Sequence, residues 1–120
     1  MRETVRGEML PVGKTLFRTG TGLRRSRMVL DEAWMELRDH AAPGGREQLR
    51  ARETAALLAT ARWAVTAALA RDESRGLHWR EDRPERDPAQ AHRLLVGGLD
   101  EVWTTPDRPL PTRRALELTP

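Results

Sequence analysis

The stretch from Glu47 to Arg71 constrains the fold of this chain more than any other. It contains no glycine or proline, is rich in alanine, and carries apolar side chains nearly all round a helical projection. A helix with that pattern is usually buried against more than one neighbour, and its small side chains let those neighbours approach closely. The stretch therefore predicts a long helix at the centre of a helical domain.

Two further segments predict helices that pack against this one. Val5 and Met9 are four residues apart and predict a short helix over 1–10, which Pro11 and Gly13 end. A second, amphipathic helix is predicted to run to about His40, because apolar residues recur there at helical spacing. These residues are Leu23, Leu30, Trp34 and Leu37.

The predicted fold class is all-α, because the three helices account for most of the chain. A short loop, Ala41-Ala-Pro-Gly-Gly45, separates the second helix from the third, so the two are expected to be antiparallel. A three-helix bundle of the spectrin-repeat type, with helices near 1–10, 21–40 and 46–72, is the simplest architecture.

The end of the chain differs in character from the helical part. Apolar stretches on either side of Gly97-Gly98 predict either a small hairpin or a strand that completes a sheet elsewhere. Pro106–Pro111 and Leu116–Leu118 are expected to form a frayed terminus. We therefore divide the chain into a helical domain, 1–92, and an extended tail, 93–120.

Composition limits the classes of protein that this chain can be. A length of 120 residues suits one domain and is too short for a nucleotide-binding domain plus a substrate domain. The absence of cysteine excludes disulfides and thiolate-bound iron–sulfur clusters within this sequence. No apolar run is long enough to span a membrane and no signal peptide is indicated, so we expect a cytoplasmic protein without direct membrane insertion.

The positive charge lies mostly in the first quarter of the chain. Residues 1–30 carry a net charge of +5 and the remaining residues −2, and Lys14 is the only lysine among 21 basic residues. A basic face of this kind could track nucleic-acid phosphates. We favour an acidic protein neighbour or a solvated face, because basic stretches commonly serve these roles.

Several motifs of small-molecule chemistry are absent or incomplete. Gly13-Lys14-Thr15 lacks the glycine spacing and the preceding strand of a phosphate-binding loop, and no glycine-rich dinucleotide fingerprint is present. His40, His78 and His92 do not have the spacing of a metal pair. We therefore expect that this chain on its own binds neither a flavin nor a dicarboxylate, and that it has no catalytic, cofactor-binding or metal-binding residue.

The four tryptophans fall into two groups. Trp34 and Trp63 sit in helical apolar patterns, which favours core packing over base stacking. Trp79 and Trp103 lie outside the predicted helices. The second pair is better suited to a domain interface.

The most specific part of the sequence is the stretch Glu73-Ser-Arg-Gly-Leu-His-Trp-Arg-Glu-Asp-Arg-Pro84, called the signature segment below. It resembles the pattern Glu-Ser-Arg-Gly-x-His-x-Arg-x-Asp-x-Pro of the succinate dehydrogenase, fumarate reductase and L-aspartate oxidase flavoproteins, which closes the long helix of their C-terminal domain. Eight spaced positions match: Glu73, Ser74, Arg75, Gly76, His78, Arg80, Asp82 and Pro84. Arg83 stands where an aromatic residue is common. Weaker similarity extends over roughly residues 1–95.

The resemblance implies a supporting and docking function. It implies that the chain is the helical C-terminal domain of an FAD-dependent oxidoreductase acting on succinate, fumarate or aspartate, with the flavin and substrate sites outside this sequence. The implied partners are the flavin-binding domain and an iron–sulfur subunit. The alternative is a free-standing, Arg-rich helical adaptor that binds nucleic acid or protein through its basic N-terminal part.

The signature segment is also open to interpretation from its residues alone. Gly76 is expected to end the long helix in a left-handed conformation, with Arg75 bonding the last carbonyls and Arg80 paired with Asp82. Since Arg and Trp are enriched in interfaces, we expect the segment, Trp79 included, to dock on the flavin domain. A solvated charged loop is the alternative.

Overall fold

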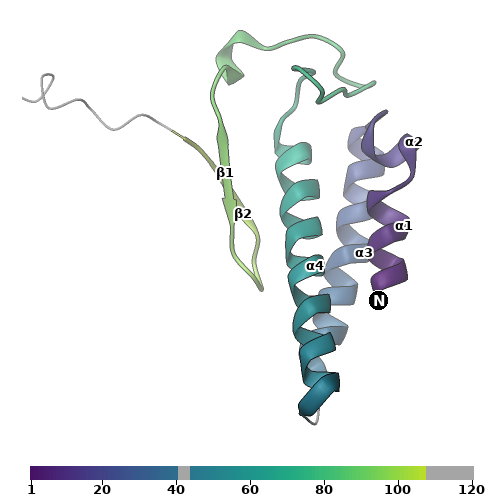
Figure 1. Cartoon of the computed structure of the whole chain (residues 1–120). Helices are drawn as coiled ribbons and strands as arrows, with labels where there is room; N and C mark the ends of the chain where they lie inside the picture. The colour runs from purple at the N-terminus through teal and green to yellow at the C-terminus, as the bar shows by residue number, and fades with distance from the viewer. Residues whose placement is uncertain (41–43, 108–120) are drawn as a thin grey trace, which may run out of the picture.

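Three helices lie side by side and form the body of the molecule (Figure 1). The structure is a computed structural model of the chain and describes residues 1–40 and 44–107. The helices are α1 (Arg2–Met9), α3 (Gly20–Asp39) and α4 (Gly45–Ala70), and a short α2 (Val12–Thr15) follows α1. The predicted all-α bundle and its three helices are confirmed, with bounds that differ by only one or two residues.

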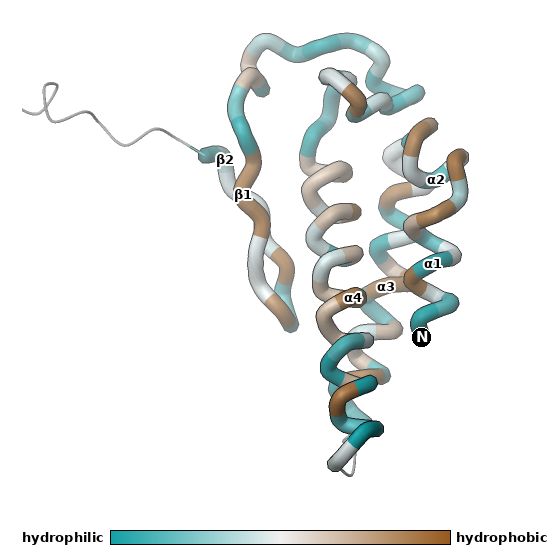
Figure 2. The backbone as a smooth tube through the Cα atoms, in the orientation of Figure 1, coloured by the Kyte–Doolittle hydropathy of each residue, from teal (hydrophilic) through white to brown (hydrophobic). Residues whose placement is uncertain are grey.

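The core lies where these three helices meet. It consists of Val5 from α1, two leucines and an alanine from α3, and three residues from α4. Leu30 of α3 and Leu58 of α4 are fully buried at its centre. Figure 2 shows that α4 is hydrophilic near its start and more apolar along its second half, which is the part that has neighbours on two sides. This is why α4 lacks a single apolar face.

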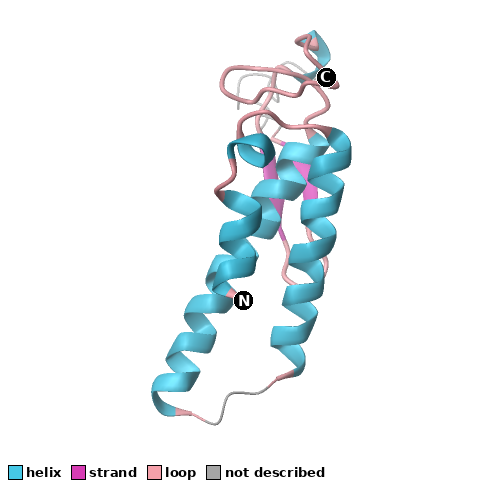
Figure 3. Ribbon diagram, turned by 90° about the vertical axis from the view of Figure 1, so that its right-hand side faces the viewer, coloured by secondary structure: helices cyan, strands magenta, loops and turns pink. Residues whose placement is uncertain are grey.

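The second neighbour of α4 is a β-hairpin. Strands β1 (Leu94–Gly97) and β2 (Trp103–Pro106) pair in antiparallel fashion and pack against α4, as Figures 1 and 3 show. A single 3₁₀ turn, Pro88–Gln90, precedes them. Of the two alternatives for this part of the chain, the hairpin is therefore correct.

Side chains of α4 hold the turn of the hairpin. The buried Arg62 forms an ion pair with Asp31, 2.7 Å from Nε to Oδ1, and its Nη1 donates a hydrogen bond to the carbonyl of Leu99. Trp63 donates its indole N–H to the carbonyl of Gly98 at 2.7 Å. The expectation that Trp63 lies in the core is wrong, because Trp63 is only partly buried, is not among the residues that form or pack on the core, and is tied to the hairpin by this hydrogen bond.

Some predictions fall on residues that the structure does not describe. Residues 41–43 of the predicted loop and residues 108–120 of the predicted frayed terminus lie outside the described residues. The domain boundary at residue 92 stays a prediction. Within the described ranges, no helix is both long and apolar enough to cross a membrane.

Candidate functional site

The signature segment lies at the end of the bundle where α4 ends and α3 begins. Two backbone hydrogen bonds attach it to Arg18, which precedes Thr19, the N-cap of α3. The N–H of Arg18 donates to the carbonyl of Trp79, and the N–H of Glu81 donates to the carbonyl of Arg18. The segment thus joins the C-terminal end of α4 to the connection between α2 and α3. Its side chains complete this joint through three clusters of contacts.

The first cluster is centred on Glu73, whose carboxylate is fully buried. It accepts hydrogen bonds from Arg75 Nε at 2.8 Å, from Arg71 Nη1 at 2.8 Å and from the backbone N–H of Asp87 at 2.6 Å. Hydrogen bonds from these donors, of which the one from Arg75 has the largest effect, lower the pKa of Glu73 to about 2, although burial alone would raise it. Glu73 is therefore an ionised structural anchor for the chain that follows α4.

The second cluster is a bidentate pair between Arg80 and Asp82. Arg80 is 3% exposed and donates to both carboxylate oxygens of Asp82, from Nε at 3.1 Å and from Nη2 at 2.7 Å. Asp82 also accepts the backbone N–H of Gly20, at the start of α3, at 3.0 Å. The hydrogen bonds from Arg80 and Gly20 lower the pKa of Asp82 to about 2. The predicted pairing of Arg80 with Asp82 is present, and it joins two helix ends.

The last carbonyls of α4 are bonded by different residues from those predicted. Arg80 Nη1 donates to the carbonyls of Leu69 and Arg71, at 3.2 and 3.5 Å, whereas Arg75 binds Glu73 instead. Gly76 has the predicted left-handed conformation, with φ of 57°. However, α4 ends at Ala70, so Gly76 serves the turn between Arg75 and His78 and not the helix end. The charged side chains after Ala70 take over the capping that Gly76 was expected to provide.

The third cluster joins His78 to Arg18. His78 Nδ1 lies 2.6 Å from Arg18 Nη1, and His78 Nε2 lies 3.0 Å from the carbonyl of Arg71. Because a guanidinium group can only donate, Nδ1 must accept and Nε2 must carry the proton. Burial and the positive charges of Arg18 and Arg80 lower the pKa of His78, although the hydrogen bond to Arg71 opposes this. His78 is therefore a neutral side chain that links Arg18, before α3, to the carbonyl of Arg71, after α4.

Ser74 closes the turn of the segment from inside. Its hydroxyl oxygen accepts the backbone N–H of Arg80 at 2.8 Å, and the hydroxyl donates to the carbonyl of Arg83 at 2.7 Å. Among the residues that the structure describes, no buried side-chain nitrogen or oxygen lacks a hydrogen-bond partner. The polar residues of the segment thus satisfy one another within this chain.

Two apolar residues of the same segment point outward. Leu77 is 95% exposed and Trp79 is 43% exposed. Leu16 and Phe17, which immediately precede the Arg18 backbone paired with Trp79, are also exposed. These four exposed apolar residues, called the exposed end below, lie at the joint, whereas Glu73, Ser74 and Arg80 of the same joint are buried.

Comparison with known proteins places this sequence in a family. A family model described as "Fumarate reductase flavoprotein C-term" matches residues 8–102. The L-aspartate oxidase of Rhodospirillum rubrum is 47% identical over 88 residues, which cover 73% of this chain and 30% of that protein. The L-aspartate oxidase of Streptomyces coelicolor is 45% identical over 58 residues, which cover 48% of this chain and 9% of that protein. The matched part is less than a third of either relative.

This chain belongs to the fumarate reductase flavoprotein family, in which it corresponds to the C-terminal region. The family model covers α2, α3, α4, the signature segment and the hairpin up to the residue before β2, and it includes only the last two residues of α1. The family match does not favour the alternative of a free-standing Arg-rich adaptor.

Sequence reasoning missed several residues of the joint in this family member. Arg71 and Arg18 bind members of the signature segment, but they lie outside it, and neither was predicted to take part. The side chain of Arg71 also donates to the carbonyls of Gln90 and His92, at 2.9 and 2.7 Å. An arginine at the end of an apolar helix is a weak signal, because such a residue is usually exposed.

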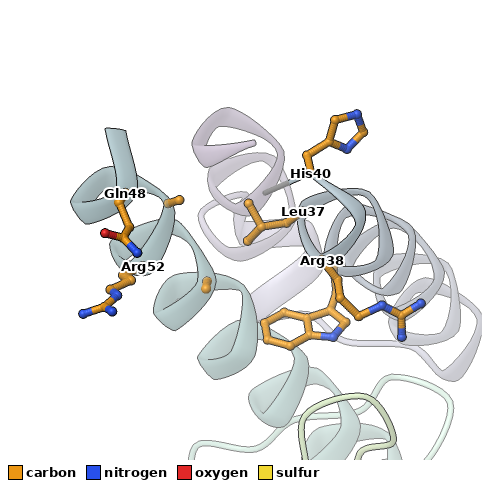
Figure 4. A pocket seen from close by; sticks show the side chains of 8 residues that line it. Leu37, Arg38, His40, Gln48 and Arg52 are labelled. Atoms are coloured by element: carbon orange, nitrogen blue, oxygen red, sulfur yellow. The ribbon is translucent and has the colours of Figure 1, made fainter. Parts of the chain in front are cut away.

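A hollow at the opposite end of α3 and α4 has a different character. It measures about 420 Å³, and Figure 4 shows Leu37 between the two helices, with His40 and Arg38 directed away from α4. Nowhere in residues 1–40 and 44–107 do three or more His, Asp or Glu side chains gather as metal ligands would. Nothing in the lining of this hollow therefore suggests a catalytic or metal-binding site.

Proposed function

We propose that this chain is a supporting domain that docks on the flavin-binding part of an FAD-dependent oxidoreductase and is not catalytic alone. The observation that carries this proposal is the division of roles in the signature segment. Its Glu73 and Arg80 are buried and hydrogen-bonded within the domain, whereas Leu77 and Trp79 are exposed, as are Leu16 and Phe17. An exposed aromatic and aliphatic surface over a rigid polar joint is typical of a protein interface.

The signature residues divide into two groups in this proposal. Trp79 contacts the flavin-binding part directly, while Glu73, Ser74, Arg80 and Asp82 fix the backbone that presents it. Arg75, Gly76 and His78 hold the turn from which Leu77 projects. The interface expected from the sequence is thus refined to the exposed end.

FAD is proposed to bind outside this chain. The two described strands form an antiparallel hairpin, so the glycine-rich turn between a parallel strand and a helix is not found among the described residues. By family analogy, the flavin of the whole enzyme would accept electrons from, or donate them to, a small dicarboxylate or amino-dicarboxylate. An iron–sulfur subunit is a further proposed partner, and the cytoplasm is the proposed location.

Co-expression tests this function. The chain would be co-expressed with the separately encoded flavin-binding domain of the parent enzyme. The two proteins would then be separated by gel filtration. We expect one yellow complex that contains both polypeptides, and a colourless protein when the chain is produced alone. A flavoprotein that elutes without this chain would contradict docking, and a yellow isolated chain would contradict the supporting role.

A further inference from the structure

A groove beside the signature segment has a strongly cationic rim. It measures about 450 Å³ and lies between the second half of α4, the residues after α2 and the start of β1. Its polar lining comes from Arg18, Arg71, His78 and Arg93. No Asp or Glu is among the described residues that line it. The groove therefore collects positive charge from three separate parts of the chain.

Among the described residues, one guanidinium group at this groove, that of Arg18, has no carboxylate partner. Arg71 is paired with Glu73 and the exposed Arg93 with Asp107, at 2.8 and 2.7 Å. Arg18 has no carboxylate within ion-pair distance in the described part of the chain, and its Nη2 makes no hydrogen bond to a described residue. Burial also lowers the pKa of Arg18, as expected for a charge that has lost water without gaining a counter-ion.

The floor of the groove is apolar. It is formed by alanine side chains of α4, including Ala64 and Ala67, and by Leu94 of β1. A bare inorganic anion would leave this floor uncovered, whereas a ligand with a carbon chain would bury it. The size of the groove is within the range of small-molecule sites, which combine an apolar lining with a few convergent polar groups.

We infer that this groove binds a small organic carboxylate, with its anionic group on Arg18 and its carbon chain over the alanines of α4. Arg93 is placed to bind a second anionic group of the same ligand. This inference goes beyond docking, the function proposed above. It also revises the expectation that the isolated chain binds no dicarboxylate, since Arg18 and Arg93 come together only in the fold.

Nuclear magnetic resonance of the full chain tests this inference. The imidazole signals of His78 would be followed during titration with glutarate, and His40 at the far end of α3 would be the internal reference. We expect a saturable shift of His78 alone, with inorganic phosphate binding more weakly at equal ionic strength. Equal or tighter binding of phosphate would overturn the organic class of ligand.

Three variants sharpen the result. Arg18→Gln is expected to weaken glutarate binding about tenfold through loss of a charge-assisted hydrogen bond. Arg93→Gln is expected to weaken it about threefold, since the Arg93 side chain is 88% exposed. Arg46→Gln, the same change on the exposed first turn of α4, is the matched control and should leave binding unchanged.

The inference is overturned if His78 shows no saturable shift at up to about 10 mM glutarate. It is equally overturned if Arg93→Gln and Arg46→Gln bind glutarate alike, because binding would then reflect only the net charge of the protein.

Discussion

Replacing Arg80 by methionine tests whether the signature segment holds the domain together. Methionine keeps most of the aliphatic length of Arg80 but removes every donor of its guanidinium group. The bidentate pair with Asp82 and the hydrogen bonds to the carbonyls of Leu69 and Arg71 would be lost. Asp82 would keep its hydrogen bond from Gly20.

The expected loss of stability follows from these contacts. Charge-assisted hydrogen bonds to a partly exposed carboxylate contribute about 1.5–3 kcal/mol, and the helix-end carbonyls contribute about 1 kcal/mol more. Burial of the methionine side chain offsets roughly 1 kcal/mol. We therefore expect the free energy of unfolding to fall by about 1.5–3 kcal/mol, which lowers Tm by about 6–12 °C for a domain of this size.

Urea denaturation followed by circular dichroism would measure this loss. Arg83→Met is the matched control, because Arg83 lies in the same segment and pairs with Asp72, but both side chains are more than half exposed, at 57% and 53%. An exposed pair of this kind contributes at most about 1 kcal/mol. If Arg80→Met cost no more than Arg83→Met, the Arg80–Asp82 pair would not stabilise the joint and the reasoning would be refuted.

Three further predictions concern the same joint and the hairpin. Gly76→Ala should lower the free energy of unfolding by about 1–2 kcal/mol in urea denaturation, because φ is 57° there while the space for a Cβ is open. The arginine partners of Glu73 and Asp82 lower the pKa of both carboxyl groups to about 2, below the unfolded values of 4.5 and 3.8. The stability that these ionised carboxylates contribute is therefore present above about pH 5 and is lost as the pH falls towards 2. Urea titrations between about pH 5 and pH 2 should show this fall in the free energy of unfolding, and the fall should be smaller in Glu73→Gln. Trp63→Phe removes the hydrogen bond to Gly98 and should cost about 1 kcal/mol, with faster amide exchange in the hairpin than in α3; unchanged exchange there would refute the role given to this hydrogen bond.

The helices were predictable because their signals are local. The apolar spacing of α3 and the length of the alanine-rich stretch in α4 predicted both elements within two residues. The hairpin was predicted only as one of two alternatives, since the sequence around Gly97-Gly98 does not say which strand pairs with which. The pairing depends on Arg62 and Trp63, which hold the hairpin turn against α4 across more than thirty residues of sequence.

The site was predictable as a segment but not as a set of contacts. The pairing of Arg80 with Asp82 is local, only two residues apart, and was predicted. The roles of Arg71 and Arg18 depend on how the end of α4 meets the connection before α3, which no spacing in the sequence specifies. Gly76 was assigned to the helix end because a glycine commonly follows a helix, whereas charged side chains bond the last carbonyls here.

The affinity of this chain for the flavin-binding part, measured for wild type, Trp79→Ala and Leu49→Ala, tests the central claim most directly. Trp79, 43% exposed, belongs to the exposed end, and Leu49, 57% exposed, is an apolar residue at the opposite end of the bundle. We expect Trp79→Ala to weaken binding by about 1–2 kcal/mol, or roughly tenfold in Kd, and Leu49→Ala to leave the Kd unchanged. Wild-type affinity in Trp79→Ala, or an equal loss in Leu49→Ala, would contradict docking through the exposed end.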